Sequence, residues 1–348
     1  LTDNEVIEII NNSPIANDTI IAKPAYGQQG KGIIISNNVQ TLVAEMRQNT
    51  EEKDFVISKY LDDPYLIKLN KEGVSGVTYN DTSGRKCHLR AYVLIHSKKK
   101  NNSPNSPNSL NVYLYNESLI FCAAKEYNSC SEEDKQFCNL TNLYYGSKYY
   151  KDILNKNPGD AYKDLSGLAR DLIPPSEYPQ LMERIKHIIK TTILAVKDDL
   201  LCLNNNDCYQ YIAFDLHLEK SPNNSSVPMP WLLEVNATPG LKSPDYQWQS
   251  IGGLQNFLES ILNITIKTKM SKNGKQLFEY LPFNKKPIEF DKFDLPFKHY
   301  NNKKDYSCTD NKYKDIKKAL QLLNIPGRSY LTTKQAMCEG LAKVQIKS

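Results

Sequence analysis

Two pairs of β-rich segments, each joined by a polar, proline-containing loop, constrain this fold more than any other feature of the sequence. Residues 89–96 and 112–115 are joined through 98–107, and residues 211–218 and 231–236 are joined through 221–230. Alternating and β-branched residues in these segments are typical of strands. Each pair therefore predicts a β-hairpin, and together they indicate an α+β fold with antiparallel sheets.

Helical periodicity accounts for most of the remaining chain. Helices are expected over residues 4–10, 39–47, 177–201 and 250–262, and further strands over 19–24, 33–36 and 55–60. Residues 266–305 are rich in Lys, Phe and Pro without a clear period and are expected to be a tether. A helical pair is expected over 312–323 and 332–342.

The composition of the 348 residues, 40% hydrophobic and 24% charged, is ordinary for a globular protein. The sequence contains no apolar run long enough to span a bilayer and no leader-like start, so we expect no membrane association and a cytoplasmic location. The net charge of +5 mildly favours acidic partners. Nucleic acid is not an expected partner, because no basic stripe with interleaved aromatic residues is present.

The eight cysteines form no CxxC pair and no cluster with zinc-binding spacing. We therefore expect free thiols in a reducing compartment. Two closely spaced pairs, Cys130 with Cys138 and Cys202 with Cys208, are the candidates for exceptions.

A glycine-rich loop with Gly27, Gly30 and Gly32 lies between two predicted strands. A dinucleotide-binding fold or a P-loop would present phosphate to the start of a helix, so this context argues against both. Glycine loops also fold over phosphates through their backbone N–H groups, although ordinary glycine hairpins are common. Lys23 ends the preceding strand, where its ammonium can reach the same phosphates.

A second set of cationic side chains is expected on the strand that begins at Lys86. Side chains alternate along a strand, so Lys86, His88 and Arg90 share one face, and the residues between them face the core. Three potential cations side by side repel one another unless an anion lies between them. The alternative is an ordinary solvated strand face.

The most informative set is acidic. Asp215 lies between apolar residues in one predicted strand, and Glu234 and Asn236 share a face of the next. An unpaired carboxylate is costly in such a strand, which indicates a neutralising cation. Two carboxylates and an amide oxygen are ligands suited to Mg²⁺ that bridges nucleotide phosphates. A buried salt bridge with lysines is the alternative.

Taken together in their order along the chain, these segments resemble the tubulin tyrosine ligase and ligase-like family of the ATP-grasp superfamily. The resemblance spans residues 20 to about 262 and rests on IAKP with its glycine loop (21–24), VISKYL (56–61), KCHLR (86–90), VYLY (112–115), NLTN (139–142), FD (214–215) and LLEVNA (232–237). Tyr127-Asn128-Ser129 looks closer to the tyrosine ligase branch than to the polyglutamylases.

This resemblance implies an ATP-grasp fold, with ATP and Mg²⁺ as cofactors. The implied nucleotide contacts are Lys23, Gly30, Lys59, Tyr60, Leu61, Lys86, His88, Thr141 and Asn142. The implied metal ligands are Asp215, Glu234 and Asn236, and the implied catalytic residues are Arg90, Lys86 and Glu234. The expected reaction joins tyrosine to the C-terminal glutamate of detyrosinated α-tubulin through an acyl phosphate, and the acidic tubulin tail is the expected partner. Association with microtubules would follow.

The resemblance also divides the chain. It implies a nucleotide-lid subdomain at 1–62, the ATP-grasp core with its Mg-ATP site at 63–265, a linker at 266–305 and a helical tail at 306–348. The family's N-terminal domain would be largely absent, since 22 residues precede Lys23.

Two residues depart from the family pattern. His88 stands where an aspartate is usual, and Asn116 stands where active relatives often have arginine, for which Lys125 is a possible substitute. Two alternative functions therefore stay open. One is a ligase that adds glutamate or glycine, and the other is a catalytically degenerate module that binds ATP or tubulin.

Overall fold

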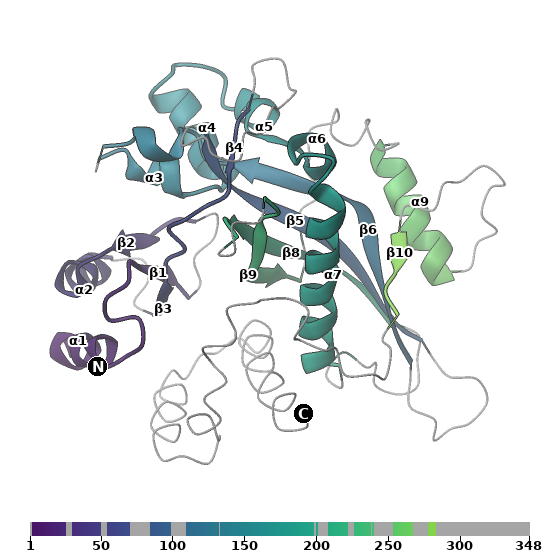
Figure 1. The fold of residues 1–348 in the computed structure, drawn as a ribbon, viewed down its shortest axis with the longest axis horizontal. Coiled ribbons are helices and arrows are strands. Elements are labelled where there is room, and N and C mark those ends of the chain that lie inside the picture. Colours follow the sequence, from purple (N-terminus) through teal and green to yellow (C-terminus); the bar gives the residue numbers. More distant parts are fainter. Residues whose placement is uncertain are drawn as a thin grey trace, which may run out of the picture. The chain divides into compact units, whose positions relative to one another are not determined.

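Figure 1 shows the fold as a computed structural model. The described residues are 2–25, 30–49, 54–69, 84–98, 109–131, 133–197, 200, 208–221, 226–237, 239, 253–266 and 278–282. The chain divides into two compact units. Unit 1 comprises Leu1–Tyr92, Asn116–Met182 and Ala213–Glu259, and unit 2 comprises Val93–Tyr115, Glu183–Ile212 and Ser260–Ser348.

A three-stranded antiparallel sheet with two helices forms the N-terminal part of unit 1. The strands β1 (Ile20–Pro24), β2 (Ile34–Ser36) and β3 (Phe55–Lys59) lie in the order β2-β1-β3. The helices are α1 (Asp3–Asn11), which starts with a capping box formed by Thr2 and Glu5, and α2 (Val39–Gln48). All five elements lie where the sequence predicts them.

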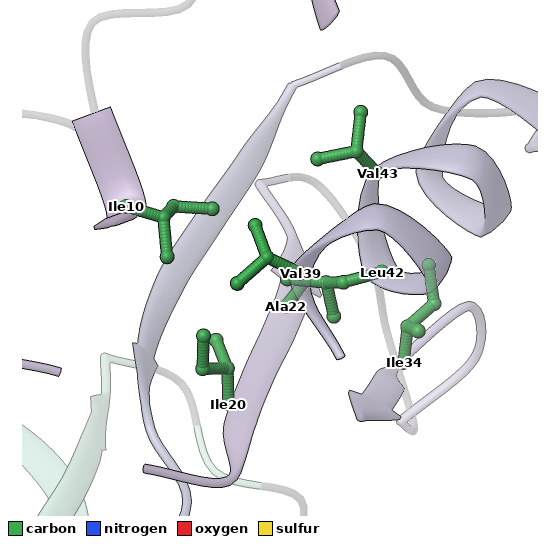
Figure 2. Packing of buried hydrophobic residues seen from close by; sticks show 7 residues of the cluster. All are labelled: Ile10, Ile20, Ala22, Ile34, Val39, Leu42 and Val43. Atoms are coloured by element: carbon green, nitrogen blue, oxygen red, sulfur yellow. The ribbon is translucent and has the colours of Figure 1, made fainter. Parts of the chain in front are cut away.

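Apolar residues at helical and strand spacing hold this part together. Figure 2 shows the cluster, which consists of Ile10, Ile20, Ala22, Ile34, Val39, Leu42 and Val43. Leu42 is 0% exposed and lies between α2 and the sheet. The strand that carries Lys23 is thus fixed by packing on its apolar side.

A seven-stranded sheet carries the candidate residues of segments 86–90, 215 and 234–236. Its order is β10 (Phe278–Tyr280), β6 (Ser109–Cys122), β5 (Arg85–Lys98), β8 (Cys208–Glu219) and β9 (Met229–Asn236). Two short strands are added, since β4 (Leu66–Ile67) pairs with β5 and β7 (Ser166–Leu168) pairs with β6. The β8–β9 hairpin is antiparallel, and β5 and β6 are neighbours, as the sequence predicts. The antiparallel sheets with helices confirm the α+β prediction.

The helices agree with the sequence in part. Helix α7 (Tyr178–Ala195) is shorter than the predicted 177–201, and α9 (Gly253–Ile266) overlaps the predicted 250–262. Four short helices have no predicted counterpart: α3 (Lys135–Asn139), α4 (Leu143–Asp152), α5 (Asp160–Asp164) and α6 (Ala169–Leu172). A 3-10 turn, η1 (Tyr127–Ser129), precedes them. The helices of four or five residues show too few turns for periodicity to identify, whereas α4, with ten residues, is as long as α2 and was missed despite its length.

Parts of the predicted organisation lie outside the described residues. The loop at 98–107 is described at residue 98 alone, and the tail at 306–348 not at all. Within the segment expected to be a tether, Phe278–Tyr280 forms a strand that pairs with β6.

The prediction of free thiols is wrong for the described cysteines. Cys87 on β5 is bonded to Cys122 on β6, and Cys130 is bonded to Cys138. Cys208 is also disulfide-bonded. The first pair is 35 residues apart in sequence, and it meets because β5 and β6 are neighbouring strands. Spacing alone cannot reveal such a pair.

Among the described residues, no helix has the length and apolarity needed to cross a membrane.

Replacing Leu42 by alanine tests the N-terminal packing. The change removes a fully buried side chain, so the free energy of unfolding should fall by about 2–5 kcal/mol. Chemical denaturation measures this, with Gln40→Ala on the exposed side of the same helix as the control. Equal stability of the two variants would contradict the described packing.

Candidate active site

An ion pair between β5 and β8 lies at the centre of the candidate site in unit 1. Arg90 Nε donates to Asp215 Oδ1 and Arg90 Nη2 donates to Asp215 Oδ2, both at 2.7 Å. The side chain of Asp215 is 6% exposed and that of Arg90 is 24% exposed. Burial alone raises the pKa of Asp215, but the hydrogen bonds and charge of Arg90 outweigh it and hold the pKa below its usual value. Asp215 is therefore a carboxylate.

The β8–β9 hairpin brings the other two predicted metal ligands to Asp215. Glu234 is the register partner of Asp215, and Asn236 is the partner of Ala213. Asn236 Nδ2 donates to Asp215 Oδ2 at 2.9 Å and to Glu234 Oε1 at 3.3 Å. Glu234 keeps contact with solvent, yet partial desolvation and the neighbouring charge of Asp215 raise its pKa. The alternative of a buried salt bridge is thus realised at Asp215, with Arg90 in place of a lysine.

These donors fit a hard divalent cation. Two adjacent carboxylates and an amide provide oxygen ligands, and Mg²⁺ in nucleotide sites uses one or two carboxylates together with phosphates. A cation between Asp215 and Glu234 would also relieve the repulsion that raises the pKa of Glu234. In the described part of the chain, no three His, Cys, Asp or Glu side chains gather as a metal-binding group.

Lys86 lies over the segment expected to hold the adenine edge. Its Nζ donates to the backbone oxygen of Leu61 at 3.0 Å and lies 3.8 Å from the ring centroid of Tyr60. Burial, together with the positive charge of Lys23, lowers the pKa of Lys86 to about 7. Tyr60 is itself buried, and its hydroxyl donates to Asn139 at 2.8 Å.

His88 is buried between Lys86 and Arg90 on the same strand face. Its Nδ1 forms a hydrogen bond with Thr141 Oγ1 at 2.7 Å, and its ring packs against Phe121 with 5.2 Å between the ring centroids. Burial lowers the pKa of His88 to about 4, so the ring is neutral at pH 7. The expected row of three cations is therefore wrong at this position, because desolvation outweighs the attraction of Asp215.

His217 belongs to the same sheet face and was missed by the sequence reasoning. It lies two residues after Asp215 on β8 and is 2% exposed. The positive charges of Lys86 and Lys23 act on its ring. Alternation along the strand, applied beyond Asp215, was the signal that could have identified it.

The described end of the glycine loop lies against the start of α4. Gly30 has a φ of +77°, and a Cβ there would lie 3.3 Å from Asn142 and Tyr145 side-chain atoms. Tyr145 Oη donates to the Gly30 carbonyl at 3.2 Å. This places Gly30 beside Asn142, as expected for two residues of one site. Gly27 lies outside the described residues.

The remaining two lysines differ in their surroundings. The charge of Lys23 acts on both Lys86 and Glu234. The side chain of Lys59 instead donates to Asp18 at 2.8 Å on the surface.

Comparison with known proteins decides the family. The sequence model described as "Tubulin-tyrosine ligase family" matches residues 3–273. The chain belongs to this family.

Among relatives, a probable tubulin polyglutamylase of Caenorhabditis elegans is 25% identical over 80% of this chain and 60% of its own length. A probable alpha-tubulin polyglutamylase of Tetrahymena thermophila is 25% identical over 68% of this chain and 51% of its own. A tubulin polyglutamylase of Homo sapiens is 26% identical over 65% of this chain and 23% of its own. The chain thus spans about half the length of the first two relatives.

Membership of the tubulin-tyrosine ligase family makes this an ATP-grasp type of fold, in agreement with its mixed helices and antiparallel sheets.

Two residues depart from the family pattern. The first, His88, is a neutral and buried ring in the structure. Asn116 is exposed on β6, and the proposed substitute Lys125 donates to Asp134 at 2.8 Å. Its ammonium is thus engaged by a carboxylate outside the group around Asp215.

Replacing Lys86 by methionine tests the burial of its ammonium. The folded pKa is about 7, below the 10.5 of an ordinary lysine, so between these values the unfolded chain binds more protons and wild-type stability rises with pH. At about 1.4 kcal/mol per pKa unit, Lys86→Met should be more stable by a few kcal/mol near pH 6.5, and the difference should shrink towards pH 9.5.

Urea unfolding at the two pH values measures this difference. Lys148→Met, at an exposed position of α4, is the control and should show a small change. A Lys86→Met variant that is less stable than the wild type at pH 6.5 would contradict the desolvated lysine.

Proposed function

We propose that this chain is an ATP-dependent carboxylate–amine ligase that adds glutamate to the acidic tail of tubulin. The facing carboxylates of Asp215 and Glu234, with Arg90 and Asn236 bonded to Asp215, carry the proposal. Family membership and the polyglutamylase relatives support it. The net charge of +5 suits an acidic substrate.

In this proposal the sheet face holds Mg-ATP along its length. Asp215, Glu234 and Asn236 would hold Mg²⁺, which when bound neutralises phosphate charge. Lys23 and Lys86 would bind the phosphates. Lys86 would leave the Leu61 carbonyl, which can then accept from the exocyclic amine of adenine.

The chemistry follows from the need for a better leaving group. A carboxylate is a poor acyl donor, so its oxygen first attacks the γ-phosphorus of ATP, which forms an acyl phosphate and releases ADP. The amine of the incoming amino acid then attacks the acyl carbon, an amide bond forms, and phosphate leaves while the amine loses its proton. Arg90 would stabilise the negative oxygens with its forked donors once a cation replaces it at Asp215.

Glutamate replaces tyrosine as the preferred amino acid because the reported relatives are described as polyglutamylases. The tyrosine expectation rested on Tyr127-Asn128-Ser129. In the structure these residues form a 3-10 turn, and Tyr127 Oη donates to the Asp62 carbonyl. The Tyr127 ring lies 6.0 Å from Lys86 Nζ, so its contacts are with the proposed nucleotide segment.

A second candidate is a module that binds ATP or tubulin without turnover. The neutral His88 at a position where the family usually has aspartate favours it. This candidate predicts Mg-ATP binding without incorporation of any amino acid.

An incorporation assay separates these functions. The protein is incubated with tubulin, including detyrosinated tubulin, together with ATP and Mg²⁺. Labelled glutamate, glycine and tyrosine are supplied in separate parallel reactions. We expect glutamate incorporation. Tyrosine incorporation alone would overturn the glutamate proposal, and nucleotide binding without any incorporation would favour the binding module.

Within the active protein, Glu234→Gln should lower incorporation by at least about 100-fold, because an amide cannot supply the metal's second carboxylate. Glu45→Gln at an exposed position of α2 is the control and should retain activity. Circular dichroism and thermal unfolding verify that both variants fold. Near-normal turnover in Glu234→Gln would remove Glu234 from the metal site.

A further inference from the structure

The described end of the glycine loop is a tight turn that starts at Gly30. The Ile33 N–H donates to the Gly30 carbonyl at 3.4 Å, and Gly32, the third residue of the turn, has a φ of +71°. A type II turn requires a positive φ at this position, which glycine adopts at no steric cost. A Cβ on Gly32 would lie 3.0 Å from Cγ of Pro24, the residue after Lys23. The turn is therefore folded close to the strand end that carries Lys23.

Two tyrosines of helix α4 contact this turn. Tyr145 Oη donates to the Gly30 carbonyl at 3.2 Å, and Lys31 Nζ lies 4.9 Å from the ring centroid of Tyr144. A Cβ on Gly30 would lie 3.3 Å from the Tyr145 ring and from the Asn142 side chain. The two segments are thus in close contact, although 115 residues separate Gly30 from Tyr145 in the sequence.

The hydroxyl of Tyr145 is not needed for packing. Tyr145 is 8% exposed and belongs to an apolar cluster with Phe137, Leu140 and Leu165, against which Ile33 also packs. A phenylalanine ring would fill the same space. A buried hydroxyl costs free energy unless it forms a hydrogen bond, and the bond that this hydroxyl forms is the one to the turn. The hydroxyl therefore contributes to the turn and not to the apolar cluster.

This hydrogen bond also orients the peptide group between Gly30 and Lys31. That peptide bond is trans, and in a trans peptide the C=O and the N–H point in opposite directions. Because the Gly30 carbonyl is directed at the Tyr145 hydroxyl, the N–H of Lys31 is directed away from that hydroxyl. Successive backbone N–H groups of loops are donors that bind phosphate oxygens. Tyr145 thus fixes the direction of one such donor.

We propose that Tyr145 is a positioning residue for the phosphates of ATP, whose hydroxyl holds the turn at Gly30 in the orientation that presents the Lys31 N–H to them. The inference rests on the proposed function, because it takes ATP as the ligand. Tyr145 acts through the backbone of Gly30 and not by contact with the nucleotide. Without the hydroxyl the turn keeps its apolar contacts but loses this constraint, so nucleotide binding has to order the turn and becomes weaker.

Removal of the hydroxyl alone tests this role. The dissociation constant of a non-hydrolysable ATP analogue is measured with Mg²⁺ by calorimetry for the wild type and Tyr145→Phe, and that of adenosine by displacement of the analogue. The analogue should bind about three- to tenfold more weakly to Tyr145→Phe, the effect of one hydrogen bond. Adenosine has no phosphates and should bind equally well to both proteins.

Tyr150→Phe is the matched control. Tyr150 lies on the same helix, is 7% exposed, and its hydroxyl donates to Asp164 at 2.9 Å. Thermal unfolding should show a similar small loss of stability in Tyr145→Phe and Tyr150→Phe, because each loses one hydrogen bond. Binding of the ATP analogue should be weakened in Tyr145→Phe alone.

Gly30→Ala provides a second test. Alanine at a φ of +77° is strained, and its Cβ would lie 3.3 Å from Asn142 and Tyr145 side-chain atoms, so the change should displace the turn and weaken binding of the ATP analogue by itself. If Tyr145 acts through Gly30, the two losses are coupled. The double variant should then bind the analogue about as weakly as the weaker single variant.

Three results would each overturn the inference: unchanged binding of the ATP analogue by Tyr145→Phe, an equal loss for adenosine or in Tyr150→Phe, or fully additive losses in the double variant. Each leaves the ligase proposal standing. A wild-type protein that binds neither the ATP analogue nor adenosine would overturn both.

Discussion

The bidentate ion pair of Arg90 and Asp215 is the interaction on which the candidate site depends. It joins β5 to β8 and keeps a buried carboxylate ionised. Removing one partner of such a pair typically costs about 3–5 kcal/mol, because the other charge is left buried and uncompensated. The pair also orients Asp215 so that Asn236 donates to it and Glu234 faces it across the hairpin.

Charge changes along the sheet face in a way that suits a nucleotide. Glu234 faces Asp215 across the hairpin, and the Lys86 ammonium lies at the Leu61 carbonyl. Between them lie two neutral imidazole rings, those of His88 and His217, whose pKa values are lowered chiefly by burial. In the proposed function, the acidic end of this face would hold the metal and the lysines would bind phosphate, once Lys86 leaves the Leu61 carbonyl.

Strand alternation predicted much of this arrangement. The period of two placed Lys86, His88 and Arg90 on one face, and the polar loop at 221–230 predicted the hairpin that pairs Asp215 with Glu234. Sequence could not reveal protonation, because the neutral state of His88 depends on burial by distant residues such as Thr141 and Phe121. The same applies to the Cys87–Cys122 disulfide, which depends on the neighbouring positions of β5 and β6. The five-residue helix α3 before Asn142 was missed because it contains too few turns to show a period, whereas α4, with ten residues, was missed although it is as long as α2.

The central claim is that Asp215 belongs to a metal site that binds Mg-ATP. The most direct test measures, by calorimetry, the binding of a non-hydrolysable ATP analogue with and without Mg²⁺ to the wild type and to Asp215→Asn. Because Asp215 and Glu234 are assigned to the metal, Mg²⁺ should tighten binding at least about tenfold in the wild type and have little effect in Asp215→Asn. Thermal unfolding establishes that the variant is folded at the temperature used. An equal Mg²⁺ dependence in both proteins would contradict a metal site at Asp215.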